Sequence, residues 1–428
     1  MDTSAFWFRR DLRIEDNTGL REATQSGHII LLVFIFDDNI IDELPSNDPR
    51  LNFIHQSLET INNQLLKHNG ALLVLKGNPI EIWKKLIKNY NLRAIYANQD
   101  YEPYAIQRDK ELEKLCRSNS IEFKSFKDQV IFEKDEVLKA DGNPYTVFTP
   151  YKNKWLEHFE TINLQSSNLS SIDSASFFKP QKKFPGKQEL GIKANTVLPK
   201  SYKLKTILNY DKHRNFPSKD AGSYLGPYLR FGRISIRKLV QKAINENQTF
   251  LSELIWREFF MQILYHFPKV INNAFKTKYD NIKWKNDTEQ FEKWCNGKTG
   301  YPMVDAGMRQ LNQTGYMHNR VRMITASFLV KHLLIDWRWG EAYFAKKLLD
   351  FELSSNNGNW QWAAGTGCDA APYFRIFNPS EQQKKFDPKF EYIKKWVPEF
   401  GTDKYPGPII EHRFARKRAL ETYKKAIN

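Results

Sequence analysis

The chain has 428 residues, of which 41% are hydrophobic, so it can bury a large core and is long enough for two or three domains. The three cysteines, Cys116, Cys295 and Cys368, are odd in number and far apart, which argues against a disulfide framework or a cysteine-based metal cluster. The N-terminus lacks the pattern of a secretion signal, and the longest apolar run, residues 29–36, is too short to cross a membrane. We therefore expect a soluble, cytoplasmic protein without a membrane partner.

The positive charge lies in the second half of the chain. Of 65 Lys and Arg and 49 Asp and Glu, residues 1–200 contain 27 and 27, whereas residues 201–428 contain 38 and 22. A basic surface concentrated on one domain is what a nucleic-acid backbone attracts. A lysine-rich protein without such a partner would have the same net charge of +16, so charge alone does not decide.

Residues 1–130 alternate short apolar runs with helical patterns, which predicts a doubly wound parallel sheet. The segment after the first strand, Arg9 to Arg13, replaces the glycine-rich turn that cradles a dinucleotide, so a dinucleotide should bind elsewhere. The expected strands are residues 4–8, 28–36, 71–76, 94–98 and 121–126, and the expected helices are residues 52–67, 79–89 and 104–118.

Residues 163–200 are rich in Ser, Lys, Pro and Gly and have little periodicity, which is typical of a surface connector. From residue 201 the pattern is helical to the end. We therefore predict an α/β domain over residues 1–130, a connector over residues 131–200 and an all-helical domain over residues 201–428.

Residues 250–268 read FLSELIWREFFMQILYHFP and predict a helix with two distinct faces. Glu253 and Trp256 are three residues apart and share one face, on which a buried carboxylate would need a partner. On its own, this pair is more simply an exposed Glu beside a core Trp. The other face is an apolar stripe that should enter the core, formed by Leu251, Ile255, Phe259 and Ile263.

Two later segments place polar and aromatic side chains together. On a helix, Asn319, Arg322 and Met323 would share a face. Trp360 and Trp362 stand among small residues that let the backbone approach a flat ligand. An isolated Trp-x-Trp usually fills a core, so this pair alone does not identify a site.

Taken together, these segments resemble the photolyase/cryptochrome family, and most of all the class I photolyases that repair cyclobutane pyrimidine dimers in DNA. The resemblance is carried by Asn356, GNWQWAA at residues 358–364, DAAPYFR at residues 369–375 and IFNP at residues 376–379, and it runs in order from Phe6 to about Phe400. It implies that the helical domain binds FAD, which is active in the reduced form, and that DNA is the partner.

The resemblance also implies a set of flavin contacts. Arg322 would pair with Asp350 beside the flavin, and Asn356 would face its N5 atom, where plant cryptochromes carry Asp and animal ones Cys. Gly222 and Gly226 stand where the family usually has hydroxyl residues, so their contacts would come from the backbone. The implied cofactor-binding residues are Tyr210, Gly222, Ser223, Tyr224, Leu225, Gly226, Phe250, Arg322, Asp350, Glu352 and Asn356.

Three further sets of residues follow from the resemblance. The catalytic set comprises Glu253, Trp256, Asn319, Met323, Asn356 and Trp362; Trp256 would pack on the dimer, and Glu253 would bond to a pyrimidine carbonyl and ring nitrogen. The DNA-binding set comprises Arg214, Glu253, Trp256, Arg257, Asn319, Arg320 and Gln382. The tryptophans that would carry electrons to oxidised flavin are Trp284, Trp337 and Trp360.

The subtype depends on three of these positions. The branch that repairs (6-4) photoproducts has a histidine pair where this chain has Asn319 and Met323, and cryptochromes that prefer single strands usually have Tyr in place of Trp362. We therefore expect dimers in double-stranded DNA as the substrate and a monomeric enzyme. The alternative is a cryptochrome, a blue-light photoreceptor without repair activity. It is disfavoured by Asn356, Glu253, Trp362 and the short segment after Phe400.

A second, antenna chromophore is not identified by the sequence. Folate-binding members of the family carry an Asn-Glu pair in the last loop of the sheet domain, where this chain has Tyr104 and Ala105. Folate is therefore disfavoured, and a deazaflavin, FMN and no antenna at all stay open.

Overall fold

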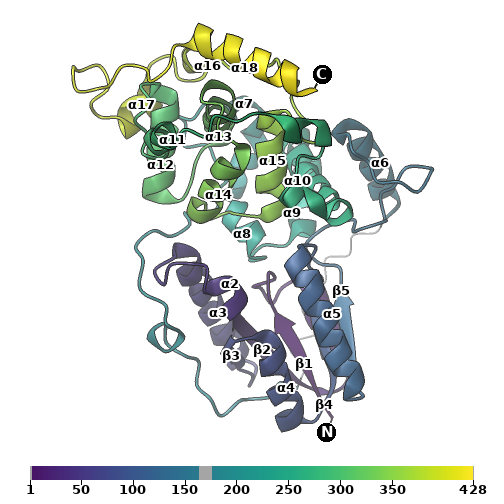
Figure 1. Ribbon diagram of the computed structural model, residues 1–428. Helices are drawn as coiled ribbons and strands as arrows, with labels where there is room; N and C mark the ends of the chain where they lie inside the picture. Colours follow the sequence, from purple (N-terminus) through teal and green to yellow (C-terminus); the bar gives the residue numbers. More distant parts are fainter. Residues whose placement is uncertain (1, 163–175, 428) are drawn as a thin grey trace. The chain divides into compact units, whose positions relative to one another are not determined.

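The computed structural model describes residues 2–162 and 176–427, which form two compact units (Figure 1). The first unit comprises Met1–Glu136, His158–Lys200 and Leu225–Lys242, and the second comprises Val137–Glu157, Ser201–Tyr224 and Ala243–Asn428. The chain therefore passes between the units several times. Residues 163–175, in the stretch predicted as a connector, lie outside the described residues.

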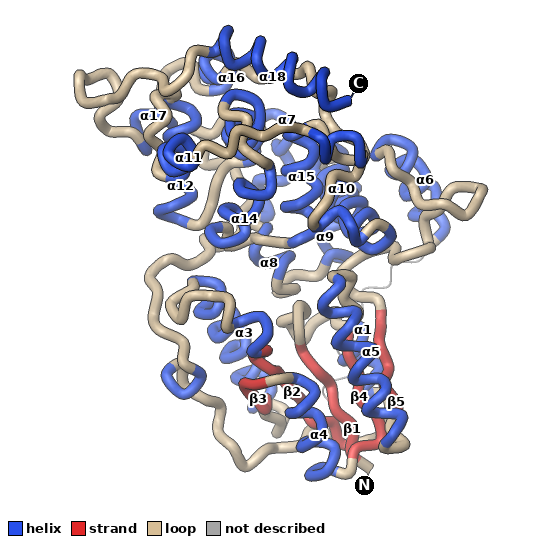
Figure 2. Tube along the Cα trace, viewed as in Figure 1, coloured by secondary structure: helices blue, strands red, loops and turns tan. Residues whose placement is uncertain are grey.

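Strands of the first unit form a parallel sheet with the order β3-β2-β1-β4-β5, drawn in red in Figure 2. This order, with its reversal between β1 and β4, confirms the predicted doubly wound sheet. Every strand expected from the sequence is present, with its ends displaced by a residue or two. The strands are β1 Thr3–Phe8, β2 Ile29–Asp37, β3 Leu72–Gly77, β4 Leu92–Asn98 and β5 Glu122–Phe126.

Helices cover both faces of this sheet. Phe6 and Leu32 pack with α1 (Thr18–Thr24) and α3 (Pro49–Leu66) on one face. Their neighbours Trp7 and Val33 point to the other face and pack with α4 (Pro79–Tyr90) and α5 (Pro103–Ser118). Since both faces are covered, the central strands β1 and β2 are almost wholly apolar, which is why they stand out in the sequence, whereas the edge strand β5 alternates Phe with exposed polar residues. A short helix, α2 (Asp38–Ile41), follows β2 directly.

Ion pairs fill the turn that follows β1. Arg13 binds Asp128 at 2.8 Å and Arg237 binds the same carboxylate at 2.9 Å. Burial raises the pKa of Asp128, but these two guanidinium groups outweigh burial and hold the pKa below its usual value. Arg9 binds Asp109 at 2.5 Å in the same region. The carboxyl end of β1, where doubly wound folds bind nucleotides, is thus lined by the chain's own ion pairs instead of glycine.

The second unit is helical, as the sequence predicts from residue 201 onwards. Its central helix, α15 (Leu353–Ala364), packs against three others, α10 (Gln248–His266), α13 (Asn319–Ser327) and α14 (Trp337–Lys347). A π-helical turn, Phe328–His332, follows α13. The remaining helices of this unit are α6 (Phe148–Thr161, whose end belongs to the first unit), α7 (Tyr210–His213), α11 (Thr288–Cys295), α12 (Pro302–Thr314), α16 (Pro379–Phe386), α17 (Glu391–Trp396) and α18 (His412–Ile427); α8 (Gly226–Arg230) and most of α9 (Ile236–Glu246) belong to the first unit.

Within the described ranges, the protein has no helix with the length and apolar character that crossing a membrane requires.

A glycine lets α15 approach α10 closely. A Cβ atom built on Gly358 would lie 2.2 Å from the ring of Phe260, too close for any real contact. Alanine in a helix normally favours folding over glycine by about 1 kcal/mol, whereas overpacking a core costs about 1–3 kcal/mol. We expect Gly358→Ala to lower the free energy of unfolding, measured by urea denaturation. Asn359→Ala, at an exposed position of the same helix, serves as the control and should be neutral or slightly stabilising. A more stable Gly358→Ala protein would contradict this close approach.

Candidate active site

Helix α10 presents the two faces that the sequence predicts. Its N-cap Asn247 accepts a hydrogen bond from the Phe250 amide, which fixes the start of the helix. The stripe Leu251, Ile255, Phe259 and Ile263 is buried in the core, as predicted. Glu253 and Trp256 are only partly buried, on the other face.

Glu253 has a charged partner inside this unit. A guanidinium nitrogen of Arg214 donates to its carboxylate at 2.7 Å. Burial raises the pKa of Glu253, and Arg214 opposes that rise. Arg214 also lies over the ring of Tyr210, 5.1 Å from its centroid, and Tyr210 meets Phe250 edge to face. The structure therefore brings together four predicted site residues and gives Glu253 the partner that a buried carboxylate needs.

Trp256 keeps part of its ring exposed and has aromatic neighbours on two helices. Phe148, at the start of α6, stacks on it, and Phe260 of α10 contacts it at a tilt, 5.3 Å between centroids. Phe148 comes from the range predicted as a connector, and no pattern in the sequence predicts its contact with Trp256.

Helix α13 carries the three residues that the sequence predicts to lie on one helix face. Asn319 is exposed at its first position, and Met323 is partly buried one turn later. Arg322 binds Asp350 at 2.9 Å, which is the pair that the resemblance implies. Arg320 binds Asn215 at 2.6 Å and lies over the ring of Phe386, on α16. The last of these contacts places α16, with the predicted DNA-binding residue Gln382, next to α13.

The N-cap of α13 is a histidine that should make stability depend on pH. The Nδ1 atom of His318 accepts from the Arg320 amide at 3.2 Å, so this nitrogen must be unprotonated. Burial, together with Arg320, Arg322 and Arg214, lowers the pKa of His318 to about 4. Between the ordinary value of 6.5 and about 4, the unfolded chain binds this proton more readily than the folded one.

We therefore expect the free energy of unfolding to fall as the pH drops from 6.5 towards 4, by at most about 3 kcal/mol at ~1.4 kcal/mol per pKa unit. His318→Asn retains a capping acceptor but cannot take up a proton. Urea unfolding at roughly pH 7 and pH 4.5 should show a smaller loss for His318→Asn than for the wild type. Equal losses in both proteins would mean that other groups cause the pH dependence.

Helix α15 carries Asn356, Trp360 and Trp362. The Asn356 amide donates to the carboxylate of Glu341 at 2.7 Å, which fixes which end of the side chain faces α14. Trp362 is partly buried against the core, whereas Trp360 is 2% exposed. This stretch of small residues is therefore a helix that contacts three neighbours, and not a loop.

The start of α15 has the donors that a polar, anionic cofactor requires. No side chain caps this helix, and the buried hydroxyl of Ser354 has no hydrogen-bond partner among the described residues. Arg257 binds Glu352 at 3.2 Å, immediately before the helix. With Arg322 bound to Asp350, two arginine–carboxylate ion pairs therefore flank an uncapped helix start, whose backbone amides fit the polar groups of FAD. Ser354 carries no sequence signal of its own, because a serine in a helical turn is common.

Gly222, Ser223 and Tyr224, the predicted phosphate segment, belong to the second unit. A Cβ atom on Gly222 would lie 3.0 Å from the Tyr316 hydroxyl, so the backbone passes close to that ring. Tyr224 has a positive φ of 54°, which turns the chain sharply at this point. Leu225 and Gly226 are assigned to the first unit, so their role in the site stays a prediction.

The three predicted electron-carrying tryptophans differ in exposure. Trp360 and Trp337 are buried in one core at 2% and 1% exposure, and Trp284 packs against the same core while partly exposed. Trp294, which the sequence analysis did not single out, is buried with its ring 6.1 Å from that of Trp360.

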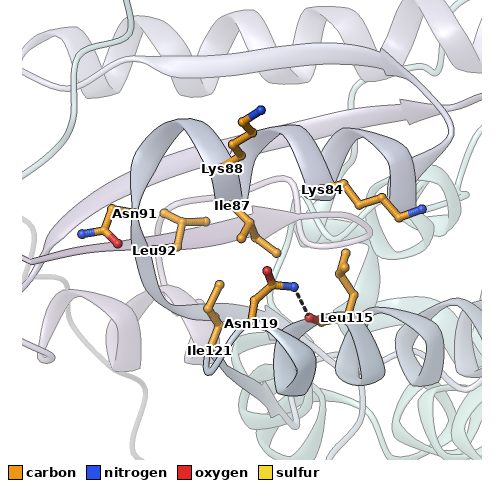
Figure 3. Close-up of a pocket in the computed structure, with 8 residues that line it drawn as sticks. All are labelled: Lys84, Ile87, Lys88, Asn91, Leu92, Leu115, Asn119 and Ile121. Carbon is orange, nitrogen blue, oxygen red and sulfur yellow. Dashed lines mark hydrogen bonds between the residues drawn. The ribbon is translucent and has the colours of Figure 1, made fainter.

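A separate hollow of about 470 Å³ lies in the first unit between α4 and α5 (Figure 3). Ile87, Leu92 and Ile121 form its apolar lining, and Lys84 and Lys88 stand at its rim. It sits where β4 begins and just before β5, at the amino ends of the strands, whereas doubly wound sheets bind ligands at the carboxyl ends. The candidate active site is therefore the one in the second unit.

Comparison with known proteins gives consistent matches along the chain. Residues 250–403 match a family model described as the FAD binding domain of DNA photolyase, and residues 4–169 match one described as DNA photolyase. A deoxyribodipyrimidine photo-lyase from Synechococcus sp. is 33% identical, covering 98% of this chain and 96% of the relative. A bacterial class III photolyase from Agrobacterium tumefaciens has a TM-score of 0.90 at 33% identity, over 99% of this chain and 98% of that one. An archaeal photolyase from Sulfolobus tokodaii, solved with two FAD molecules, has a TM-score of 0.88 at 34% identity, over 99% of this chain and 100% of that one.

Proposed function

Because the chain belongs to the DNA photolyase family, with FAD as its cofactor, we propose that it uses light to repair cyclobutane pyrimidine dimers in double-stranded DNA. The observation that carries this proposal is the convergence of α10 and α13 on α15. These helices bear Glu253 and Trp256, Asn319 and Met323, and Asn356 and Trp362. When bound in its reduced form and excited by light, FAD supplies an electron that splits the cyclobutane ring and then returns, so no net oxidation occurs.

In this proposal the protein's own residues receive and hold the lesion. A dimer must leave the base stack to reach a buried site, and aromatic rings are suited to receive unstacked pyrimidines. Trp256 and Trp362, both partly exposed, provide these rings. Glu253 bonds to a pyrimidine carbonyl and ring nitrogen, while Asn319 and Met323 contact the same dimer from α13.

The basic half of the chain supplies contacts to DNA phosphates. Residues 201–428 carry 38 Lys and Arg against 22 Asp and Glu. Arg214 pairs with Glu253 of the proposed lesion pocket, and Arg320 binds Asn215, the residue next to Arg214. Each phosphate neutralised by a cation releases about one counterion. We therefore expect the affinity for duplex DNA to fall steeply as salt rises, measured as the slope of log affinity against log salt. Binding that is indifferent to salt would contradict a phosphate-binding surface.

The proposed function is tested by single-turnover repair. Fully reduced holoenzyme is mixed with a duplex that contains one defined cyclobutane dimer, and dimers repaired are counted per photon absorbed. A (6-4) photoproduct in the same duplex and the same dimer in a single strand are the matched comparisons. Efficient repair only of the duplex dimer supports the proposal. A light-responsive flavoprotein that repairs none of these substrates would instead favour a cryptochrome photoreceptor.

A further inference from the structure

Trp256 is stacked against a ring that comes from a distant part of the sequence. Phe148 opens α6, and its ring centroid lies 3.7 Å from that of Trp256 with an angle of 9° between the planes. Aromatic pairs generally prefer offset or edge-to-face arrangements over a close face-to-face stack. The surrounding packing must therefore hold these two rings together.

Two sets of contacts anchor Phe148. Its backbone amide donates to a carboxylate oxygen of Asp369 at 3.0 Å, and its ring, only 8% exposed, meets Phe259 edge to face. Further along α6, the indole N–H of Trp155 donates at 2.6 Å to Glu258, which is 3% exposed on α10. The start of α6 is thus tied both to α10 and to the segment that follows α15.

These anchors connect the two helices that carry the aromatic walls of the proposed lesion pocket. Asp369 follows α15, which bears Trp362, while Phe148 covers one face of Trp256 on α10. Because Phe148 blocks that face, the exposed part of Trp256 lies on the rest of its ring. Phe259 and Phe260 of α10 also contact the indole, but Phe148 covers its flat face and links it, through Asp369, to the segment that follows α15.

We propose that Phe148 is a positioning residue, which sets the Trp256 ring at the angle needed to accept a rigid, cross-linked pyrimidine pair. This inference rests on the proposed function and adds a determinant of damage recognition to it. Both a dimer and undamaged pyrimidines must leave the base stack to enter, but a damaged site costs less to unpair and unstack. A cyclobutane dimer also holds its two bases in one fixed geometry, whereas two undamaged pyrimidines move independently. A Trp256 ring held at a fixed angle therefore favours the dimer over undamaged pyrimidines. A mobile Trp256 ring would lose that preference, while the contacts of the protein to DNA phosphates would remain.

The test compares variants at Phe148 as FAD-loaded holoenzymes. Phe148→Leu removes the flat ring but keeps most of the apolar volume, and Phe148→Tyr keeps the ring. Tyr151→Phe is the matched control, because Tyr151 lies on α6 and contacts Glu258 and Phe259 instead of Trp256. Dissociation constants are measured for a dimer-containing duplex and for the same duplex undamaged. Phe148→Leu should weaken dimer binding by roughly three- to tenfold, a part of the usual effect of losing a stacking ring. Its affinity for undamaged DNA and its FAD content should stay unchanged, and Phe148→Tyr and Tyr151→Phe should retain the wild-type preference.

Several outcomes would overturn the inference. An unchanged ratio of the two affinities in Phe148→Leu would show that the stack does not serve recognition, and equal weakening of both would show that Phe148 is only structural. If Phe148→Leu does not fold, Asp369→Ala releases the backbone anchor without touching the ring, and it should lower the same ratio. An Asp369→Ala protein with the wild-type ratio of affinities for dimer-containing and undamaged DNA would then contradict the proposal. If wild-type protein prefers dimer DNA but does not repair it, the proposed function fails while the role of Phe148 in recognition still stands.

Discussion

Replacing Trp360 by Phe should reduce the photoreduction of oxidised FAD to a small fraction of the wild-type rate, while repair by chemically reduced protein stays unchanged. Trp360 lies on α15, one turn after Asn356, and is 2% exposed. Phenylalanine is much harder to oxidise than tryptophan and cannot pass an electron along. Trp337 is buried in the same core and Trp284 is partly exposed. The change therefore removes the member of the predicted route that shares α15 with Asn356, the residue predicted to face the flavin.

The tight surroundings of Trp360 require a packing control. A Cβ atom on Gly340 would lie 2.1 Å from the indole ring, and Phe344 contacts the ring edge to face at 5.0 Å. Trp360→Phe should lower the free energy of unfolding by less than the ~3–5 kcal/mol that is typical when a buried aromatic residue is replaced by alanine. Phe344→Leu leaves a comparable gap beside the same ring but removes no tryptophan, so it should photoreduce normally. Equal loss of photoreduction and repair in Trp360→Phe would mean that this residue is structural.

The sheet could be predicted from the sequence because the burial of each strand shows in the pattern of its own consecutive residues. Parallel strands covered on both faces must be apolar throughout, and β2 shows this directly as residues 29–37. The apolar stripe of α10 was predicted for the same reason, since helical spacing alone places Leu251 and Ile255 on one side. The polar residues of the site became recognisable only through a family resemblance over the whole chain.

The contacts that the sequence did not reveal join segments that are far apart. Arg214 lies in the loop after α7 and Glu253 in α10, and no periodicity connects them. Phe148 lies in the range predicted as a connector. The sequence pattern of a short helix does not indicate which of the two units the helix packs against. Glycine is unfavourable inside a helix, and only the close approach of Phe260 in the structure gives the reason for Gly358 in α15.

Replacing Glu253 should have the largest effect on repair itself. In the free protein Arg214 donates to the carboxylate of Glu253 at 2.7 Å. Burial raises the pKa of Glu253, and the ion pair with Arg214 lowers it. We expect a dimer seated against Trp256 and Trp362 to exclude further water and raise this pKa again, which favours protonation of Glu253. The protonated carboxyl can then donate to the pyrimidine carbonyl, where negative charge develops once the electron arrives.

Hydrogen bonds to charged groups contribute about 1.5–3 kcal/mol, so Glu253→Ala should lower the dimers repaired per photon severalfold, with FAD content unchanged and dimer binding only moderately weaker. Glu253→Gln separates the two roles of the side chain, because its amide can donate to the carbonyl but cannot pair with Arg214 as an anion. We expect the Gln variant to keep most of the yield. Because the wild-type donor depends on a proton, its yield should fall as pH rises, whereas the yield of Glu253→Gln should not. The measurement is single-turnover repair of one defined dimer by fully reduced enzyme, with photons counted, across a pH series. An unchanged yield in Glu253→Ala would remove this residue from the mechanism, and equal losses in Ala and Gln would assign its role to the ion pair with Arg214 instead of to proton donation.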